Sequence, residues 1–200
     1  MTHLGELFTK YGTDKDAIHH YTGLYECLFR ARRFDIKSLL EVGIGTLIPE
    51  AHSSMSGFGL EGYKPGGSLR AWRDYFPNAQ IYGIDVMPDT QFSEERITTY
   101  TCDSTNTEQV LNTPIPRKFD IIIDDGSHIT EHQLATLGNL FPYLEPNGVY
   151  VVEDTYGNQL QEKIPLIRSI CGDNPLFFDW PLPSLALFHG PAALIIGKRL

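Results

Sequence analysis

The chain has 200 residues, of which 42% are hydrophobic and 20% are charged, and its formal net charge is −9. This composition is typical of a globular domain and excludes disorder as the main state. The acidic balance disfavours a nucleic-acid partner, because no basic cluster is longer than residues 30–33. No apolar run approaches the roughly 20 residues that span a bilayer, and the N-terminus lacks a signal-peptide pattern. We therefore expect a cytoplasmic protein that makes no membrane contact.

The first elements follow from hydrophobic spacing. Apolar residues recur every three or four positions over residues 14–33, which predicts an amphipathic helix. Residues 38–42 are a short apolar run before a glycine turn, which is typical of a buried strand. A second helix is expected from Ser68 to the position before Pro77. Further along the chain we predict strands at 80–86, 96–101, 119–123, 149–153, 184–189 and 192–198, and helices at 108–111, 130–143 and 159–170.

Strands that alternate with helices predict a parallel sheet with helices on both faces. Only Gly190 and Pro191 separate the last two strands, so the last strand should run antiparallel. We predict a single α/β domain over residues 1–200, in which a helical segment (1–36) precedes a Rossmann-like, seven-stranded core (37–200). Residues 45–66 show no periodicity, and loops of this length are usually functional or mobile.

Acidic residues end five of the predicted strands, at the edge where open α/β sheets bind their ligands. They are Glu41, Asp85, Asp103, the pair Asp124 and Asp125, and the pair Glu153 and Asp154. A single acidic residue at a strand end usually contacts only water and binds no ligand. Several at successive strand ends favour a ligand site.

The glycine turn at residues 41–46 limits the choice of cofactor. Ile48 stands where a dinucleotide fingerprint has its third glycine, which disfavours NAD, and no Gly-Lys-Ser/Thr sequence follows, which excludes a phosphate loop. The acidic Glu41 suits a ligand that brings positive charge to the turn. S-adenosylmethionine, with its ammonium and sulfonium groups, fits this requirement.

Other residues are suited to the remaining parts of that cofactor. Asp85 is expected to accept both ribose hydroxyls, and Asp103 to meet the adenine amino group. The helix that begins near Ser68 directs N–H groups toward the methionine carboxylate, although Ser68 alternatively serves only as an N-cap. The expected cofactor site comprises Glu41, Gly43, Gly45, Ser68, Asp85, Asp103 and Asp124.

A second constellation lies in residues 120–128, where a buried strand ends in two carboxylates, a glycine and His128. If the strand that ends at Glu153 and Asp154 is its neighbour, these two residues and Asp125 form an oxygen site suited to Mg²⁺ or Mn²⁺. A cation would relieve the repulsion among the carboxylates. Beside them, His128 is expected to be a general base, rather than a capping or packing residue.

Residues 128–132 also match the His-x-x-Glu-His pattern of inverted zinc peptidases. That motif requires both histidines on a regular helical turn, whereas His128 directly follows a strand end. We interpret the match as a coincidence. A metal-dependent hydrolase or peptidase remains the alternative function, together with a non-catalytic cofactor-binding module.

Taken together, these motifs resemble the class I S-adenosylmethionine-dependent O-methyltransferases that act on sugars of macrolides and related antibiotics. The resemblance lies in residues 11–15, His20, Tyr21, Tyr25, and residues 40–45, 65–72, 83–85, 124–128 and 153–154. It implies that the cofactor binds Glu41, Gly43, Ser68, Asp85 and Asp103, that Asp125, Glu153 and Asp154 bind Mg²⁺, and that His128 is the base. It also implies a sugar hydroxyl as acceptor.

The sequence leaves several roles open. Tyr11, Lys15, His20 and Tyr21 either close the cleft over the substrate or form only a packed N-terminal helix. The aromatic residues at 177–180 favour core packing over an acceptor pocket. A small molecule with a hydroxyl group is the expected partner, while assembly into a homo-oligomer stays open.

Overall fold

A mixed β-sheet forms the centre of the protein. The structure is a computed structural model that describes residues 3–51, 54–58, 62–155, 162–172, 176–180 and 193–197. Within these residues, eight strands are ordered β3-β4-β2-β1-β5-β6-β8-β7. The strands are β1 (Ser38–Val42), β2 (Gln80–Asp85), β3 (Ser93–Glu94), β4 (Ile97–Thr101), β5 (Phe119–Asp124), β6 (Leu144–Glu153), β7 (Leu176–Trp180) and β8 (Ala193–Gly197).

The strand directions confirm the predicted Rossmann-like class. β1 pairs in parallel with β2 and β5, β2 with β4, and β5 with β6. β8 runs antiparallel to both β6 and β7, as expected of the last strand. The short edge strand β3 was not predicted, and the aromatic stretch at 177–180 belongs to strand β7. The strand expected at 184–189 lies outside the described residues.

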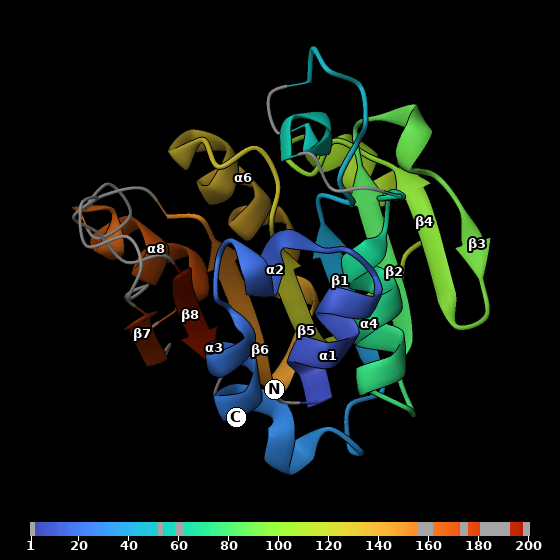
Figure 1. The fold of residues 1–200 in the computed structure, drawn as a ribbon. Helices are drawn as coiled ribbons and strands as arrows, with labels where there is room; N and C mark the ends of the chain where they lie inside the picture. Colours follow the sequence, from blue (N-terminus) through green and yellow to red (C-terminus); the bar gives the residue numbers. More distant parts are fainter. Residues whose placement is uncertain are drawn as a thin grey trace.

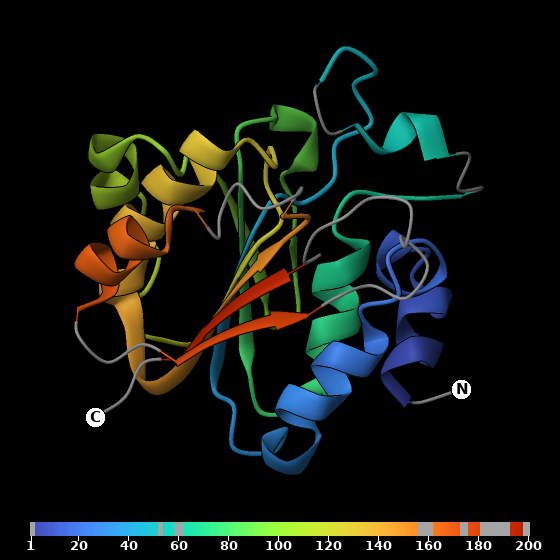
Figure 2. The ribbon, with the colours of Figure 1, turned by 90° about the vertical axis from the view of Figure 1, so that its left-hand side faces the viewer.

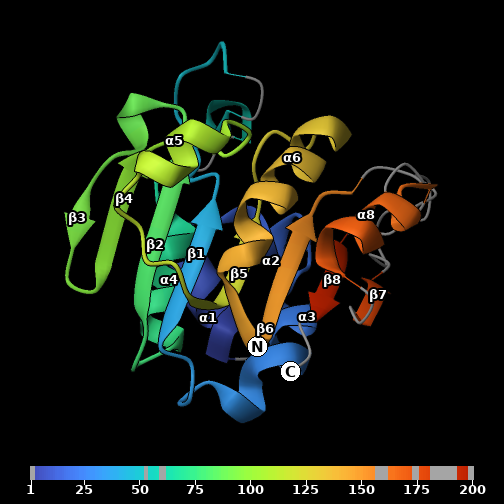
Figure 3. The same cartoon turned by 180° about the vertical axis from the view of Figure 1, so that it is seen from behind.

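Helices cover both faces of the sheet (Figures 1, 2 and 3). α1, α2, α3 and α4 lie on one face, and α5, α6 and α8 lie on the other. The helices are α1 (His3–Lys10), α2 (Asp14–Ala17), α3 (Thr22–Phe29), α4 (Gly67–Tyr75), α5 (Thr107–Asn112), α6 (Thr130–Leu140) and α8 (Ile164–Cys171), with 3-10 turns η1 (Arg30–Arg32), η2 (Met55–Phe58), η3 (Pro88–Thr90) and η4 (Phe141–Tyr143). None of these helices is both long and apolar enough to cross a membrane.

Strand alternation divides the core into two layers, because successive side chains of a strand point to opposite faces. Leu39 of β1 packs with Phe8 of α1 and Trp72 of α4 in one buried cluster. Its neighbour Leu40 packs with Leu137 of α6 in the other. The position of an acidic residue in its strand therefore determines toward which face of the sheet its side chain points.

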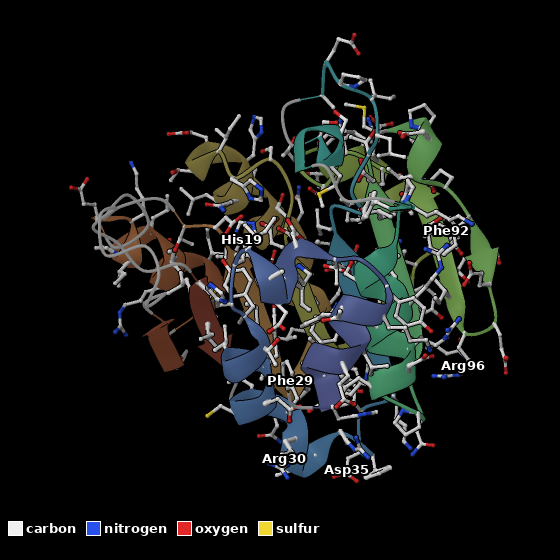
Figure 4. All side chains as sticks on the ribbon, viewed as in Figure 1. His19, Phe29, Arg30, Asp35, Phe92 and Arg96 are labelled. Carbon is white, nitrogen blue, oxygen red and sulfur yellow. The ribbon has the colours of Figure 1, made fainter. Side chains whose placement is uncertain are left out.

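The helix predicted for residues 14–33 is interrupted. α2 ends at Ala17 and α3 begins at Thr22, and between them His20 adopts a left-handed φ of 56°. The interruption turns the chain across the carboxyl ends of the strands. Figure 4 shows His19 near that end of the sheet, with Phe29 and Arg30 closer to the opposite end. α1, whose Leu4 and Phe8 are buried, was not among the predicted helices.

The glycine turn after β1 joins two neighbouring strands. The Gly43 N–H donates to the Ile84 carbonyl (2.9 Å), and the Asp125 N–H donates to the Val42 carbonyl (2.9 Å). Gly43 has a φ of +86°, and a Cβ at this position would lie 1.9 Å from the Asp125 carbonyl oxygen. Only glycine allows the backbone after β1 to approach the backbone after β5 this closely.

We therefore predict that Gly43→Ala destabilises the fold severely. Gly12→Ala is the matched control, because Gly12 also has a positive φ (+66°) but has no atom within 4 Å of its hypothetical Cβ. The control should lower the free energy of unfolding by about 1–2 kcal/mol, the cost of a left-handed L-residue, and Gly43→Ala should lower it by more. Urea denaturation measures both, and equal losses would contradict the steric explanation.

Candidate active site

A cavity of about 490 Å³ lies at the carboxyl ends of the parallel strands. It is lined by residues that follow β1, β2, β4, β5 and β6, together with parts of α2 and α6. Among the lining residues are eight that the sequence singled out, namely Gly43, Gly45, Asp85, Asp103, Asp124, Asp125, His128 and Asp154. The structure thus brings the tips of separate strands to one cavity.

Asp85, at the end of β2, fixes the glycine turn. Its Oδ2 accepts a hydrogen bond from the Ile44 N–H (2.7 Å), and its Oδ1 accepts one from the Met87 N–H (2.8 Å). Burial raises the pKa of Asp85, although these backbone donors oppose the rise. A carboxylate offers about four acceptor positions, so Asp85 can also accept hydrogen bonds from a ligand's hydroxyl groups.

Two further acids face the cavity. Asp103 accepts hydrogen bonds at Oδ1 from the Thr105 N–H (2.9 Å) and hydroxyl (2.7 Å). Asp124 is buried, and within the described chain its Oδ2 has no hydrogen-bond partner. Burial raises the pKa of Asp124 to about 7. A buried polar atom of this kind is costly unless a ligand or water satisfies it.

Glu41 and Ser68 are not among the residues that line the cavity. Glu41 is fully buried, and its Oε2 accepts a hydrogen bond from the Ser68 hydroxyl (2.8 Å). The strand pleat explains the difference, since Glu41 points to the opposite face from its neighbours Leu40 and Val42, which pack beneath α5 and α6. The expected direct contacts of Glu41 and Ser68 with a cofactor therefore have no support in the geometry.

Asp125, His128 and Asp154 form a candidate metal centre. Each offers one ligand atom, and these atoms all lie within 4.8 Å of one another. Asp125 and Asp154 follow the adjacent parallel strands β5 and β6. His128 and Asp154 have left-handed φ values of 59° and 48°. Such conformations are uncommon outside glycine and often mark functional sites.

The structure does not place Glu153 in this cluster. Glu153 is 1% exposed, and its carboxylate accepts hydrogen bonds from the Lys15 ammonium (2.7 Å) and the Tyr25 hydroxyl. Glu153 precedes Asp154 directly and points to the same face as Val151, toward the N-terminal helices. Two adjacent acids thus have different environments.

Lys15 lies at the centre of a buried ionic network. Its Nζ is 2.7 Å from Asp125 Oδ2, 2.7 Å from Glu153 Oε2 and 3.2 Å from Glu41 Oε1. Burial lowers the pKa of Lys15, but the charges of these three carboxylates outweigh it and hold the pKa well above its usual value. Lys15 is therefore charged. Its partners are distant in the sequence, so no local pattern indicated these contacts.

The segment after α2 also holds Asp154. The Tyr21 hydroxyl donates to Asp154 Oδ1 (2.7 Å), and His19 Nδ1 lies 3.3 Å from the same oxygen. Burial raises the pKa of Asp154, but the hydrogen bond and charge of His19 outweigh it and lower the pKa to about 2. Burial lowers the pKa of His19, while hydrogen bonds with Asp14 and Asp154 raise it to about 10. Sequence reasoning missed His19.

The other N-terminal candidates lie elsewhere. His20 is exposed and forms the left-handed turn that brings its two neighbours to Asp154. Tyr11 donates a hydrogen bond to Asp74 of α4 (2.5 Å) and accepts one from Arg73 (3.0 Å). Of the four residues considered for cleft closure, Lys15 and Tyr21 therefore reach the site, whereas Tyr11 and His20 do not.

The zinc-peptidase pattern finds no support in this geometry. The candidate metal centre among the described residues omits His132 and Glu131. His128 precedes α6, so the two histidines do not share a regular helical turn. His132 Nδ1 instead lies 2.8 Å from the Ser127 hydroxyl.

No protein-family model matches the chain. The chain is 38% identical over 161 residues to mycinamicin VI 2''-O-methyltransferase of Micromonospora griseorubida, an alignment that covers 76% of this chain and 36% of that protein. It is 36% identical over 218 residues to 8-demethyl-8-(2-methoxy-alpha-L-rhamnosyl)-tetracenomycin-C 3'-O-methyltransferase of Streptomyces olivaceus, which covers 98% of this chain and 51% of that protein.

A solved structure shows the same relationship. The MycE methyltransferase of the mycinamycin pathway, in complex with Mg, SAH and mycinamycin VI, superposes with a TM-score of 0.75 at 28% identity over 99% of this chain and 54% of that one. The chain thus spans between about a third and a half of the length of these relatives. In sequence and in fold it is similar to the part of these O-methyltransferases that it covers, which confirms the resemblance carried by its motifs.

Proposed function

We propose that this chain forms the site of an S-adenosylmethionine-dependent, metal-assisted O-methyltransferase. The observation that carries the proposal is the opening of the Asp125, His128 and Asp154 cluster into the same cavity as the glycine turn and Asp85. The relatives' names support it, since they are O-methyltransferases of glycosylated natural products. The favoured acceptor is a sugar hydroxyl of such a small molecule.

The cavity suits the proposed cofactor. Its volume of about 490 Å³ falls within the range of roughly 300–1,000 Å³ that is usual for small-molecule sites. Asp85 would bind the ribose hydroxyls and Asp103 the adenine amino group. The unpartnered Oδ2 of Asp124 is a further acceptor for the ligand. In this proposal Glu41 does not contact the cofactor. Its buried carboxylate lies behind the glycine turn and attracts the positive groups of the cofactor electrostatically.

The candidate metal centre suits Mg²⁺ or Mn²⁺. We assign Asp125 and Asp154 as ligands, since both offer carboxylate oxygens to the cavity, and hard divalent ions prefer oxygen. Glu153 is left out because Lys15 and Tyr25 hold it. When bound, the ion supplies Lewis acidity that makes the acceptor hydroxyl easier to deprotonate.

His128 is the proposed general base. It accepts the proton of the acceptor hydroxyl while the oxygen–methyl bond forms and the sulfur–methyl bond breaks, which leaves S-adenosylhomocysteine. Asp154 Oδ2 lies 3.8 Å from His128 Nε2 and favours the positive charge that the ring gains. Orientation of the reacting groups can contribute roughly 7–11 kcal/mol, and a general base about 10²–10⁴-fold in rate.

The setting of the reaction is also part of the proposal. We propose a small-molecule acceptor, a cytoplasmic location and no nucleic-acid partner, in keeping with the net charge of −9.

Calorimetry with S-adenosylhomocysteine tests the cofactor assignment. We expect the wild-type chain to bind it, and Asp85→Asn to weaken binding by about tenfold or more, because a charge-assisted hydrogen bond contributes about 1.5–3 kcal/mol. Asp35→Asn is the control, since Asp35 is exposed at the opposite end of the sheet (Figure 4). A metal-dependent hydrolase would show no affinity for the nucleoside.

Replacement of His128 tests the base. We expect His128→Ala to slow methyl transfer by about 10²–10⁴-fold and to leave the affinity for S-adenosylhomocysteine within about twofold. Mycinamicin VI and simple rhamnosides serve as trial acceptors. His132→Ala is the control, because a zinc peptidase would require both histidines. Unchanged turnover in His128→Ala would remove this residue from the mechanism.

The metal assignment predicts that Asp125→Asn weakens Mg²⁺ binding by at least about tenfold, since one anionic ligand is lost. Titration calorimetry with Mg²⁺ measures the affinity. The Mg²⁺ concentration that half-saturates turnover should rise in parallel with the loss of affinity. Asp35→Asn should behave as the wild type. Full activity of the wild type in excess chelator would reject the metal role.

A further inference from the structure

Lys15 contacts carboxylates from three strands beside the proposed site. Its ammonium reaches Glu41 behind the glycine turn, Asp125 in the metal centre, and Glu153 beside it. The Lys15 side chain is 2% exposed. Any role assigned to it rests on the proposed function.

The three partners of Lys15 come from adjacent strands. Glu41 belongs to β1, Asp125 follows β5 and Glu153 ends β6, and β5 lies between β1 and β6 in the sheet. One ammonium therefore sits where the acidic tips of three parallel strands converge. In many proteins a divalent cation is bound by such a group of carboxylates.

The charges around Lys15 also indicate that its ammonium takes the place of a bound cation. Glu41 and Glu153 are 0% and 1% exposed, so their charges are not screened by water. Burial and the neighbouring carboxylate Asp125 raise the pKa of Glu41 and of Glu153, and the charge of Lys15 opposes this rise. Buried carboxylates close together either take up a proton or are offset by a cation, and Lys15 supplies that cation from within the chain. While Lys15 holds Oδ2 of Asp125 and Oε2 of Glu153, those oxygens are engaged and the positive charge repels a second cation.

We propose that the Lys15 ammonium is a built-in competitor of the divalent ion. Lys15 engages Asp125 and Glu153 and thereby weakens metal binding by Asp125 and Asp154. Lys15 is thus a positioning residue. It restricts the carboxylates available to the ion to those that face the cavity, and it makes the N-terminal segment a determinant of metal affinity.

Replacement of Lys15 by methionine tests this inference. In calorimetry with Mn²⁺ alone, Lys15→Met should bind the ion at least about tenfold more tightly than the wild type, because a repelling charge is lost and two carboxylates are released. Saturating Mn²⁺ should also raise the melting temperature of the variant more than that of the wild type. A purely structural role for Lys15 predicts neither gain.

Lys10→Met is the matched control. It removes the same charge from the same face, but Lys10 is exposed and pairs with Asp74 at 3.1 Å, away from the carboxylates of the site. Its Mn²⁺ affinity should equal that of the wild type. Equal or weaker Mn²⁺ binding by Lys15→Met would overturn the inference.

If Lys15→Met fails to fold without metal, folding on addition of Mn²⁺ supports the inference. If it fails in both conditions, the comparison moves to Glu153→Gln and the double variant Lys15→Met/Glu153→Gln, which leaves fewer buried charges unpaired. The double variant should bind Mn²⁺ more tightly than Glu153→Gln, because Asp125 is released, and equal or weaker binding overturns the inference.

The experiment separates this inference from the function on which it rests. A wild-type chain that binds neither S-adenosylhomocysteine nor Mn²⁺ contradicts the proposed function. A wild-type chain that binds both, combined with no tighter Mn²⁺ binding on removal of Lys15, contradicts only the role of Lys15.

Discussion

The pairing register of β1, β5 and β6 determines which acidic side chains meet. Val42 stands opposite Asp124, and Asp124 stands opposite Val152, so the three strands end at one level. The pleat then sends neighbouring side chains to opposite faces. Asp154 consequently reaches the cavity, while Glu153 turns toward the N-terminal helices. A shift of one residue in either pairing would exchange these positions.

The buried carboxylates make the N-terminal segment part of the site. Glu41 and Glu153 are stable at their positions because Lys15 brings a positive charge to both, and the left-handed turn at His20 lets His19 and Tyr21 reach Asp154. The break between α2 and α3 thus brings His19 and Tyr21 to Asp154. A continuous helix over these residues would not bring their side chains to the strand ends in this way.

The sequence predicts what depends on local pattern, whereas contacts between distant residues lie beyond its reach. The parallel sheet, its antiparallel last strand and the convergence of Asp125 with Asp154 follow from periodicity and from the strand-end rule. Glu153 and Glu41 were expected to face the ligands, because the strand-end rule does not say to which face of the sheet a side chain points. It also does not reveal that both carboxylates contact Lys15. The contact between Lys15 and Glu153 spans 138 residues, so no spacing rule could indicate it.

The glycine turn couples the two halves of the proposed site. On one side, the Ile44 N–H is held by Asp85 at the end of β2. On the other, the backbone at Gly43 lies against the Asp125 carbonyl, so a Cβ there would collide with it. The backbone of the turn thus lies directly against the residue that the metal is proposed to bind. The proposed nucleoside side and the proposed metal side of the site are thus built on one closely packed backbone turn.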